Sequence, residues 1–321
     1  MDASSPDIDT AVSQAAQALQ KGLLVAMPTE TVYGLAADAS NADAVARVFA
    51  AKGRPAFNPL ISHLATTELA YREGDFDDRA TALAKAFWPG PLTIVVPVAD
   101  SARSNELARA GLMTIGLRVP AHPIARALLS AIGGPVSAPS ANPSGKLSPT
   151  EADDVRHGLG DAVTVVLDGG RCDAGIESTI VSVLPEEPVR LLRPGAISRE
   201  AIEALIGRLE GPQQNRISAP GQLSSHYAPR AAIRLNADSA ESGEVLLGFG
   251  PEAPADAANL STAGDTVEAA ARLYRLLRKL DASGAATIAV MPIPDSGLGE
   301  AINDRLQRAA APREQTTLID T

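Results

Sequence analysis

The chain has 321 residues, enough for about two domains of ~150 residues each. Hydrophobic residues make up 45% and charged residues 21%, a balance that excludes wholesale disorder. The net charge of −10 and an aromatic content of 3% argue against binding nucleic acid by bulk electrostatics or by base stacking.

Cys172 is the only cysteine, so neither an intrachain disulfide nor a cysteine-based zinc site can form. The N-terminal stretch MDASSPDIDT is acidic and lacks the apolar core of a signal peptide. No apolar run approaches the ~20 residues of a membrane span. We therefore expect a reduced, cytoplasmic protein that does not associate with membranes.

Helical and strand patterns alternate along the first part of the chain, which predicts one α/β domain over residues 1–210. Asn41 is a suitable N-cap for one of the helices, and Gly53 ends it. The helices are expected at 10–21, 41–53, 77–88, 122–132, 149–157 and 199–209, and the strands at 23–27, 92–98, 114–119, 135–138, 163–167, 179–184 and 189–192.

Residues 211–230 lose this periodicity and are rich in Gly, Pro, Ser and Gln. They predict a linker, and connections of this length often serve as functional lids. A second alternation over 231–321 predicts a small open α/β domain. Its strands are expected at 231–235, 245–249 and 287–291, and its helices at 266–280 and 298–310.

The best-known catalytic motifs are missing. The sequence contains no HExxH, GxSxG or GxxxxGK[ST] pattern. SANPSGKLS comes closest to a phosphate loop, but it lacks the first glycine and has Leu147 where Ser or Thr should follow Lys146. The motifs therefore select neither a covalent nucleophile nor a metal cage.

Polar segments that contain Pro and Gly follow several predicted strands. In open α/β sheets, ligands bind at these carboxyl ends of the strands. Lys52, Arg54, Arg118 and Arg193 lie in them, beside small hydroxyl residues and glycines. Such cations suit a polyphosphate that is held by orientation and charge neutralisation. The segments are PTETVYGL (28–35), KGRPAFNPL (52–60) with His63 beyond it, TIGLRVP (114–120), SAPSANPSGKLS (137–148), GIESTIV (175–181) and LLRPGAIS (192–198).

Purely structural roles are open for most of these residues. The hydroxyls of Thr29 and Thr31 could hydrogen-bond the backbone of a turn. Lys52 and Arg54 could interact favourably with the negative, carboxyl-terminal end of the preceding helix. The stretch SPTE (148–151) suits a capping box, with the helix starting at its proline. Arg193 suits a surface turn, and the stripe Arg272, Arg275, Arg278 and Lys279 suits a solvated helix face.

Taken together, the segments resemble those of the threonylcarbamoyl-adenylate synthase family. PTETVYGL, KGRPxxNPL, FWPGPLT, LRVP, APSANxSG, ESTIV and LLRPG occur in the family's order between Pro28 and Gly195. SHYAP and the second domain resemble the family's two-domain, long form. The resemblance implies a twisted open α/β sheet catalytic domain, joined by a lid-like linker to a small Rossmann-like α/β domain.

The resemblance implies an L-threonylcarbamoyladenylate synthase, a nucleotidyltransferase. It would convert L-threonine, bicarbonate or CO2, and ATP into L-threonylcarbamoyl-AMP, pyrophosphate and water, for the threonylcarbamoyladenosine (t6A) modification of tRNA. Mg²⁺ would arrive with the nucleotide. The product would pass to a downstream tRNA threonylcarbamoyl transferase, without stable tRNA binding by this chain.

The resemblance also assigns site residues. L-Threonine would be held by Thr31, His63, Arg118, Ala138 and Ser178, with Arg118 on its carboxylate. ATP would be surrounded by Lys52, Arg54, Asn58, Thr114, Ser140, Asn142, Ser148, Arg193 and Tyr227, the last as part of the lid. No covalent nucleophile is implied; Lys52, Arg54 and Arg118 would position the reactants.

Two other functions compete with this one. An RNA-binding module could use the same positively charged cavity, although the net charge of −10 disfavours it. A carbamoyl-adenylate-binding domain that serves another acceptor usually comes with additional catalytic modules.

Overall fold

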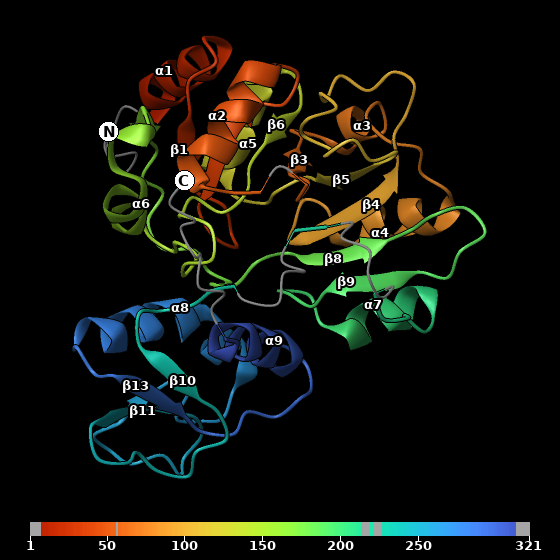
Figure 1. Cartoon of the computed structure of the whole chain (residues 1–321). Coiled ribbons are helices and arrows are strands. Elements are labelled where there is room, and N and C mark those ends of the chain that lie inside the picture. The colour runs from red at the N-terminus through yellow and green to blue at the C-terminus, as the bar shows by residue number, and fades with distance from the viewer. Residues whose placement is uncertain (1–7, 56, 213–218, 221–225, 313–321) are drawn as a thin grey trace, which may run out of the picture.

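The computed structural model describes residues 8–55, 57–212, 219–220 and 226–312, which form two α/β domains (Figure 1). The predicted linker, 211–230, therefore lies partly outside the described residues. In Figure 1 the C-terminal domain, coloured cyan to blue, lies below the N-terminal domain. None of the described helices is long and apolar enough to cross a membrane.

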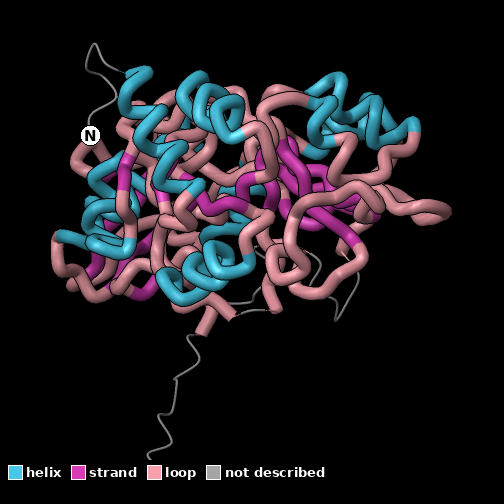
Figure 2. Tube along the Cα trace, turned by 90° about the horizontal axis from the view of Figure 1, so that it is seen from above, coloured by secondary structure: helices cyan, strands magenta, loops and turns pink. Residues whose placement is uncertain are grey.

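The N-terminal domain is built around a mixed sheet with the strand order β7-β1-β2-β6-β3-β5-β4-β8-β9. Seen from above, its strands run through the interior and most helices lie outside them (Figure 2). Its elements are α1 (Ile8–Gln20), β1 (Val25–Met27), β2 (Gly34–Asp38), α2 (Ala42–Lys52), β3 (Ile61–His63), α3 (Thr67–Ala70), α4 (Asp78–Phe87), β4 (Leu92–Pro97), β5 (Thr114–Arg118), α5 (Pro123–Ile132), β6 (Val136–Ser137), α6 (Ala152–Leu159), the 3₁₀ turn η1 (Gly160–Ala162), β7 (Val165–Val166), β8 (Thr179–Ser182), β9 (Arg190–Arg193) and α7 (Arg199–Ile206).

The two faces of this sheet differ because side chains alternate along each strand. On β5, Ile115 and Leu117 face the core formed with α4 and α7. Thr114, Gly116 and Arg118 face the other side, where Ala219 of the linker packs against Ile61 and neighbouring apolar side chains. The described linker residues Ala219 and Pro220 therefore lie over this second face.

The C-terminal domain has a four-stranded parallel sheet in the order β10-β13-β11-β12. Figure 1 shows α8 and α9 between this sheet and the N-terminal domain. Its elements are β10 (Ala232–Arg234), β11 (Glu244–Gly248), β12 (Ala258–Asn259), α8 (Thr266–Ala282), β13 (Thr287–Val290) and α9 (Gly299–Ala310). One side of α8 and α9 packs on this sheet, and the opposite side is therefore free to pack against the N-terminal domain.

Most predicted elements are present, and the differences have local causes. The strands β2, β3 and β12 and the four-residue α3 were not predicted. The sequence of β2, GLAAD, has none of the β-branched or aromatic residues that are typical of strands, and β3, β12 and α3 have too few residues for a clear periodicity. The prediction that Ser148 caps a helix starting at Pro149 is wrong: α6 begins at Ala152. Glu151 is its N-cap, and the Asp154 carboxylate accepts from the Glu151 backbone N–H, at 3.2 Å.

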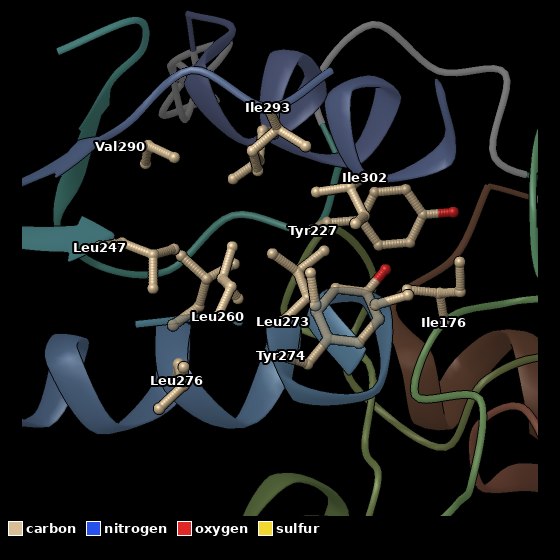
Figure 3. Close-up of a cluster of buried hydrophobic side chains, with 14 of the residues drawn as sticks. Ile176, Tyr227, Leu247, Leu260, Leu273, Tyr274, Leu276, Val290, Ile293 and Ile302 are labelled. Atoms are coloured by element: carbon tan, nitrogen blue, oxygen red, sulfur yellow. The ribbon is translucent and has the colours of Figure 1, made fainter. Parts of the chain in front are cut away.

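The two domains share one hydrophobic core. Tyr227 and Ile176 pack with Leu273, Tyr274 and Ile302 of the C-terminal domain. Figure 3 shows the two tyrosine rings one above the other, with their hydroxyl groups directed to the same side. This continuity predicts that the domains are held in a fixed arrangement.

Polar contacts add to the interface. The guanidinium of Arg278 donates to the carbonyls of Ser148 (2.9 Å) and Leu147 (3.3 Å) and lies 2.9 Å from the Asp154 carboxylate. The prediction of a fully solvated basic face on α8 is therefore wrong for Arg278, because that face meets the N-terminal domain. Arg199 of α7 pairs with Glu300 of α9 at 2.5 Å.

The backbone of Gly175 in the N-terminal domain lies directly against α8. Its φ is +67°, and a Cβ added there would lie 2.6 Å from the Ala271 Cα. Gly170 has a similar φ of +78°, but a Cβ there would meet nothing within 4 Å. Alanine substitutions at the two glycines therefore distinguish the cost of a left-handed backbone from the cost of crowding between the domains.

We predict that Gly175→Ala lowers the free energy of unfolding by at least ~2 kcal/mol more than Gly170→Ala does, because overpacking is added to the strain. Gly170→Ala should cost only the ~1–2 kcal/mol of a left-handed alanine. Urea denaturation measures both. Equal losses would contradict close packing of Gly175 on α8.

Candidate active site

A pocket of about 50 Å³ lies at one end of the large sheet, beneath the linker. The carboxyl ends of β3, β5 and β9 meet the amino ends of β4 and β8 there, because β3, β5 and β9 run in one direction and β4 and β8 in the opposite one. The pocket is lined by Thr31, His63, Arg118, Ala138 and Ser178, the residues assigned to L-threonine, and by Arg54, Ser140, Arg193 and Tyr227 from the set assigned to ATP.

Arg118 is held by contacts on three sides. Its Nε donates to the Gly90 carbonyl (3.2 Å), its Nη1 donates to the Thr31 hydroxyl (3.0 Å), and its Nη2 lies 2.7 Å from the Glu30 carboxylate. Burial acts to raise the pKa of Glu30, but the charge of Arg118, together with hydrogen bonds from Arg118 and from the backbone, lowers that pKa overall. Arg118 is thus a fixed, paired cation at the pocket wall.

Glu30 is a site residue that the sequence analysis missed. It is the only acidic residue of PTETVYGL, and a buried cation such as Arg118 requires a partner. Those two facts together were the available signal, but pairing across 88 sequence positions appears only in the folded chain.

Thr31 belongs to a turn and also lines the pocket. The Thr29 hydroxyl lies 2.8 Å from that of Thr31 and donates to the Val32 carbonyl at 2.6 Å, so the two threonines shape the turn after β1. The same Thr31 hydroxyl accepts from Arg118 and faces the pocket. A turn residue is therefore also a wall of the site.

His63 is the partner of Arg118 across the parallel strands β3 and β5. Burial first, and the charge of Arg118 second, lower the pKa of His63 to about 3. The ring is therefore neutral at physiological pH. The His63 side chain lines the pocket, and its Nδ1 has no hydrogen-bond partner within the described part of the chain.

Arg54 and Arg193 supply the other two cations of the pocket. Arg54 donates to the carbonyls of Asn58 (3.2 Å) and Pro59 (3.0 Å), and Arg193 donates to the carbonyl of Ser178 (2.9 Å). Burial lowers the pKa of Arg54 to about 10, which still leaves it charged at neutral pH. Arg193 is 5% exposed, so the alternative of a surface turn is wrong.

The remaining residues assigned to ATP do not line this pocket. Thr114 borders a smaller adjoining cavity of about 10 Å³, which shares Ile61 and Pro220 with the pocket. The backbone carbonyl of Asn58 accepts a hydrogen bond from Arg54. Lys52, Asn142 and Ser148 do not line the pocket either. Lys52 and Asn142 donate hydrogen bonds to carbonyls of the loop 137–148, and Ser148 donates one to Glu177, which faces the pocket.

Lys52 is buried and tied to that loop. Its Nζ donates to the carbonyls of Ser140 and Asn142, both at 2.6 Å. Burial and the nearby Arg54 lower the pKa of Lys52. The ammonium group thereby fixes Ser140 at the pocket edge, and we infer a positioning role from this geometry.

The described part of the linker closes the pocket. Pro220, His226 and Tyr227 line it, and Tyr227 has a φ of +59°, which is uncommon for a residue other than glycine. The Ala228 N–H donates to the Gly145 carbonyl (2.8 Å) and the His226 N–H to the Arg308 carbonyl (3.2 Å). The linker therefore rests on both domains.

Glu177 was also missed by the sequence analysis, although it belongs to the ESTIV segment. It is the only acidic residue among the described residues that line the pocket. Burial acts to raise its pKa, but Arg305 and Arg193 lower it to about 2. Its ionised form therefore stabilises the fold above about pH 4.5, and this contribution is lost as the pH falls towards 2.

Within the described ranges, no group of three or more His, Cys, Asp or Glu side chains is placed to hold a metal ion. Glu30 and Glu177 are each paired with arginine. The pocket's own residues therefore do not form a metal site.

Comparison with known proteins agrees with this geometry. A family model described as "Telomere recombination" matches residues 17–195, and one described as "Threonylcarbamoyl-AMP synthase, C-terminal domain" matches 197–311. The Bacillus subtilis threonylcarbamoyl-AMP synthase is 40% identical, over 95% of this chain and 94% of that protein. The chain belongs to the threonylcarbamoyl-AMP synthase family.

An archaeal relative extends the match to the fold. The Pyrococcus abyssi threonylcarbamoyl-AMP synthase is 40% identical over 93% of this chain and 94% of its own length. The crystal structure of P. abyssi Sua5 with L-threonine superposes with a TM-score of 0.85, at 36% identity, over 93% of this chain and 94% of that one. The predicted family, two-domain α/β fold and nucleotidyltransferase-type activity are confirmed.

We predict that Lys52→Met lowers the free energy of unfolding by about 2–3 kcal/mol, because the Ser140 and Asn142 carbonyls would be left buried without a donor. Lys85→Met, at an exposed position of α4, is the matched control and should change stability by no more than ~0.5 kcal/mol. Urea denaturation measures both. A Lys52→Met protein as stable as the control would exclude the supporting role.

Proposed function

We propose that the pocket binds L-threonine beside Mg-ATP and joins them with bicarbonate or CO2 into L-threonylcarbamoyl-AMP, with release of pyrophosphate and, when bicarbonate is used, of water. The observation that supports this most is the convergence of Arg54, Arg118 and Arg193 on one small pocket beneath the linker. These cations match a substrate pair that brings one carboxylate and one polyphosphate.

L-Threonine is proposed to lie at the Arg118 side. The guanidinium is fixed by Gly90, Thr31 and Glu30, so it can meet a carboxylate without reorganising. Neutral His63 and the Ser178 hydroxyl supply hydrogen-bonding groups beside it. The P. abyssi relative was crystallised in complex with L-threonine, which supports L-threonine as a ligand of this fold.

ATP is proposed to lie at the side of Arg54, Ser140 and Arg193, with Thr114 and Asn58 further along the same sheet face. A cavity of about 50 Å³ is well below the ~300 Å³ or more of sites that enclose small molecules. Tyr227, His226 and Pro220 must therefore move for the nucleotide to enter, which is the behaviour of a lid.

The reaction requires no covalent nucleophile from the protein. The threonine amine attacks the carbon of bicarbonate or CO2 to form a carbamate, with water lost when bicarbonate is used. A carbamate oxygen then attacks the α-phosphorus of ATP, and the bond to the β-phosphate breaks to release pyrophosphate. Arg54 and Arg193 stabilise the charge that develops on the phosphates, and Arg118 orients the amino acid.

Magnesium enters this proposal as part of the substrate, Mg-ATP. The described residues of the pocket offer no carboxylate group free of arginine to hold it, so the phosphates would be its main ligands. A cytoplasmic location and hand-off of the product to a tRNA threonylcarbamoyl transferase, for t6A formation, complete the proposal.

The first test measures pyrophosphate release from Mg-ATP, with L-threonine and bicarbonate added singly and together. We expect release only with both, and little when L-serine or L-valine replaces L-threonine at equal concentration. If no combination gives release and the protein instead binds RNA in a salt-sensitive manner, the function is that of an RNA-binding module.

A second prediction concerns Arg118. We expect the double variant Arg118→Met/Glu30→Gln to raise the KM for L-threonine by on the order of 100-fold, because the substrate carboxylate loses its charged partner. The paired change avoids leaving Glu30 ionised and alone. Steady-state pyrophosphate assays measure the KM, with Arg126→Met, at an exposed position of α5, as the control. An unchanged threonine KM would remove Arg118 from substrate binding.

A further inference from the structure

The wall of the proposed nucleotide site contains a carboxylate. Glu177 lines the pocket together with Arg54, Ser140 and Arg193, the side proposed for ATP. An ionised carboxylate beside a polyphosphate repels it, and this repulsion is strong where water is largely excluded. Glu177 is 5% exposed, so solvent screens it poorly. Its charge has to be compensated by the protein.

The compensation comes from the C-terminal domain. Arg305 of α9 donates from Nε to the Glu177 carboxylate at 2.8 Å, and the Tyr274 hydroxyl of α8 donates to the same group at 2.9 Å. From the N-terminal domain, Ser148 donates to it at 2.5 Å. Two of the three donors that satisfy this carboxylate therefore lie in a domain separate from the pocket.

Arg305 cannot contact a ligand in the pocket itself. Its side chain is fully buried and does not line the cavity. Its Nη1 pairs with Asp304 at 2.7 Å, and its guanidinium lies 5.0 Å from the centre of the Tyr227 ring. Its nearest contacts with pocket-lining residues are therefore those with Glu177 and Tyr227.

Other ionisable groups surround Glu177 as well. Arg193 of β9, Lys52 of α2, His226 and Tyr227 of the linker, and Tyr274 of α8 all interact with it electrostatically. Burial lowers the pKa of His226 to about 3, so that ring is neutral. Arg193 faces the pocket and is proposed to meet phosphate, whereas Arg305 pairs with Glu177 from outside the pocket.

We propose that Arg305 is a positioning residue for nucleotide binding: from the C-terminal domain it neutralises Glu177 in the pocket wall, so that the wall accepts the phosphates of ATP. This inference rests on the proposed function. It gives the second domain a chemical task in the site, in addition to packing. Loss of Arg305 should leave a carboxylate whose burial then raises its pKa, so that acidification partly restores nucleotide binding.

The test is a cycle of four proteins: wild type, Arg305→Met, Glu177→Gln and the double variant. Methionine removes the charge but still packs against the Tyr227 ring. Mg-ATP is titrated into each protein by calorimetry at pH 7.5, without threonine. We expect Arg305→Met to weaken binding on the order of 10- to 100-fold, and the double variant to recover to within about threefold of wild type.

A pH series separates charge from packing. Between pH 8 and pH 6 the ratio of the Arg305→Met dissociation constant to that of wild type should fall, because Glu177 becomes protonated in the variant. In the double variant the ratio should not change with pH. Arg199→Met is the matched control, since Arg199 also pairs across the domain interface but does not line the pocket. It should bind Mg-ATP as wild type does.

The outcomes are distinct. Arg305→Met binding Mg-ATP like wild type, or the double variant losing as much affinity as Arg305→Met, would overturn the inference while leaving the proposed function intact. Equal weakening by Arg199→Met would assign the effect to domain contact alone. If circular dichroism shows that Arg305→Met does not fold, the double variant decides alone: affinity within about threefold of wild type supports the inference, and a loss on the order of 10-fold or more overturns it. Wild type without affinity for Mg-ATP would overturn the proposed function itself.

Discussion

The site depends on a single constraint: several buried cations must be held in place by oxygen atoms of the protein. Lys52, Arg54, Arg118 and Arg193 all donate to backbone carbonyls, of Ser140 and Asn142, Asn58 and Pro59, Gly90, and Ser178 respectively. Carbonyl oxygens satisfy donors without adding a full negative charge, so the pocket keeps its positive character. The loops rich in Pro and Gly around the sheet end provide these carbonyls, because their backbone is not paired into strands or helices.

The same constraint explains why two carboxylates lie so close to a site proposed for anionic substrates. Glu30 and Glu177 are each matched by an arginine, Arg118 and Arg305, at 2.7 Å and 2.8 Å. One pair lies within the N-terminal domain and the other crosses the domain interface. The interface therefore does more than join two folding units: it completes the electrostatic balance of the pocket, and it holds the linker through the Tyr227 and His226 contacts with α9.

Much of the fold follows from periodicity and capping. Asn41 begins α2 and Gly53 ends it, as predicted, because an Asn side chain accepts the first backbone N–H groups and glycine tolerates the left-handed turn. Elements of two to four residues, such as β3 and β6, lie near the limit of what a pattern can indicate. The start of α6 was misplaced because two capping sequences overlap, SPTE at 148–151 and the stretch from Glu151 to Asp154, and Ser148 is instead drawn to Glu177 by a hydrogen bond across 29 residues.

The sequence by itself determined the alternation of helices and strands, the family, and the identity of the cations and hydroxyls that line the pocket, because short-range spacing and ordered motifs are written in neighbouring residues. Only the tertiary structure decided which oxygen atom each cation meets, that Glu30 and Glu177 belong to the site, and that Arg278 and Arg305 serve the interface and not the solvent. These features depend on pairing between residues far apart in the chain, and that pairing arises when burial removes water and leaves each charge to find a partner within the protein.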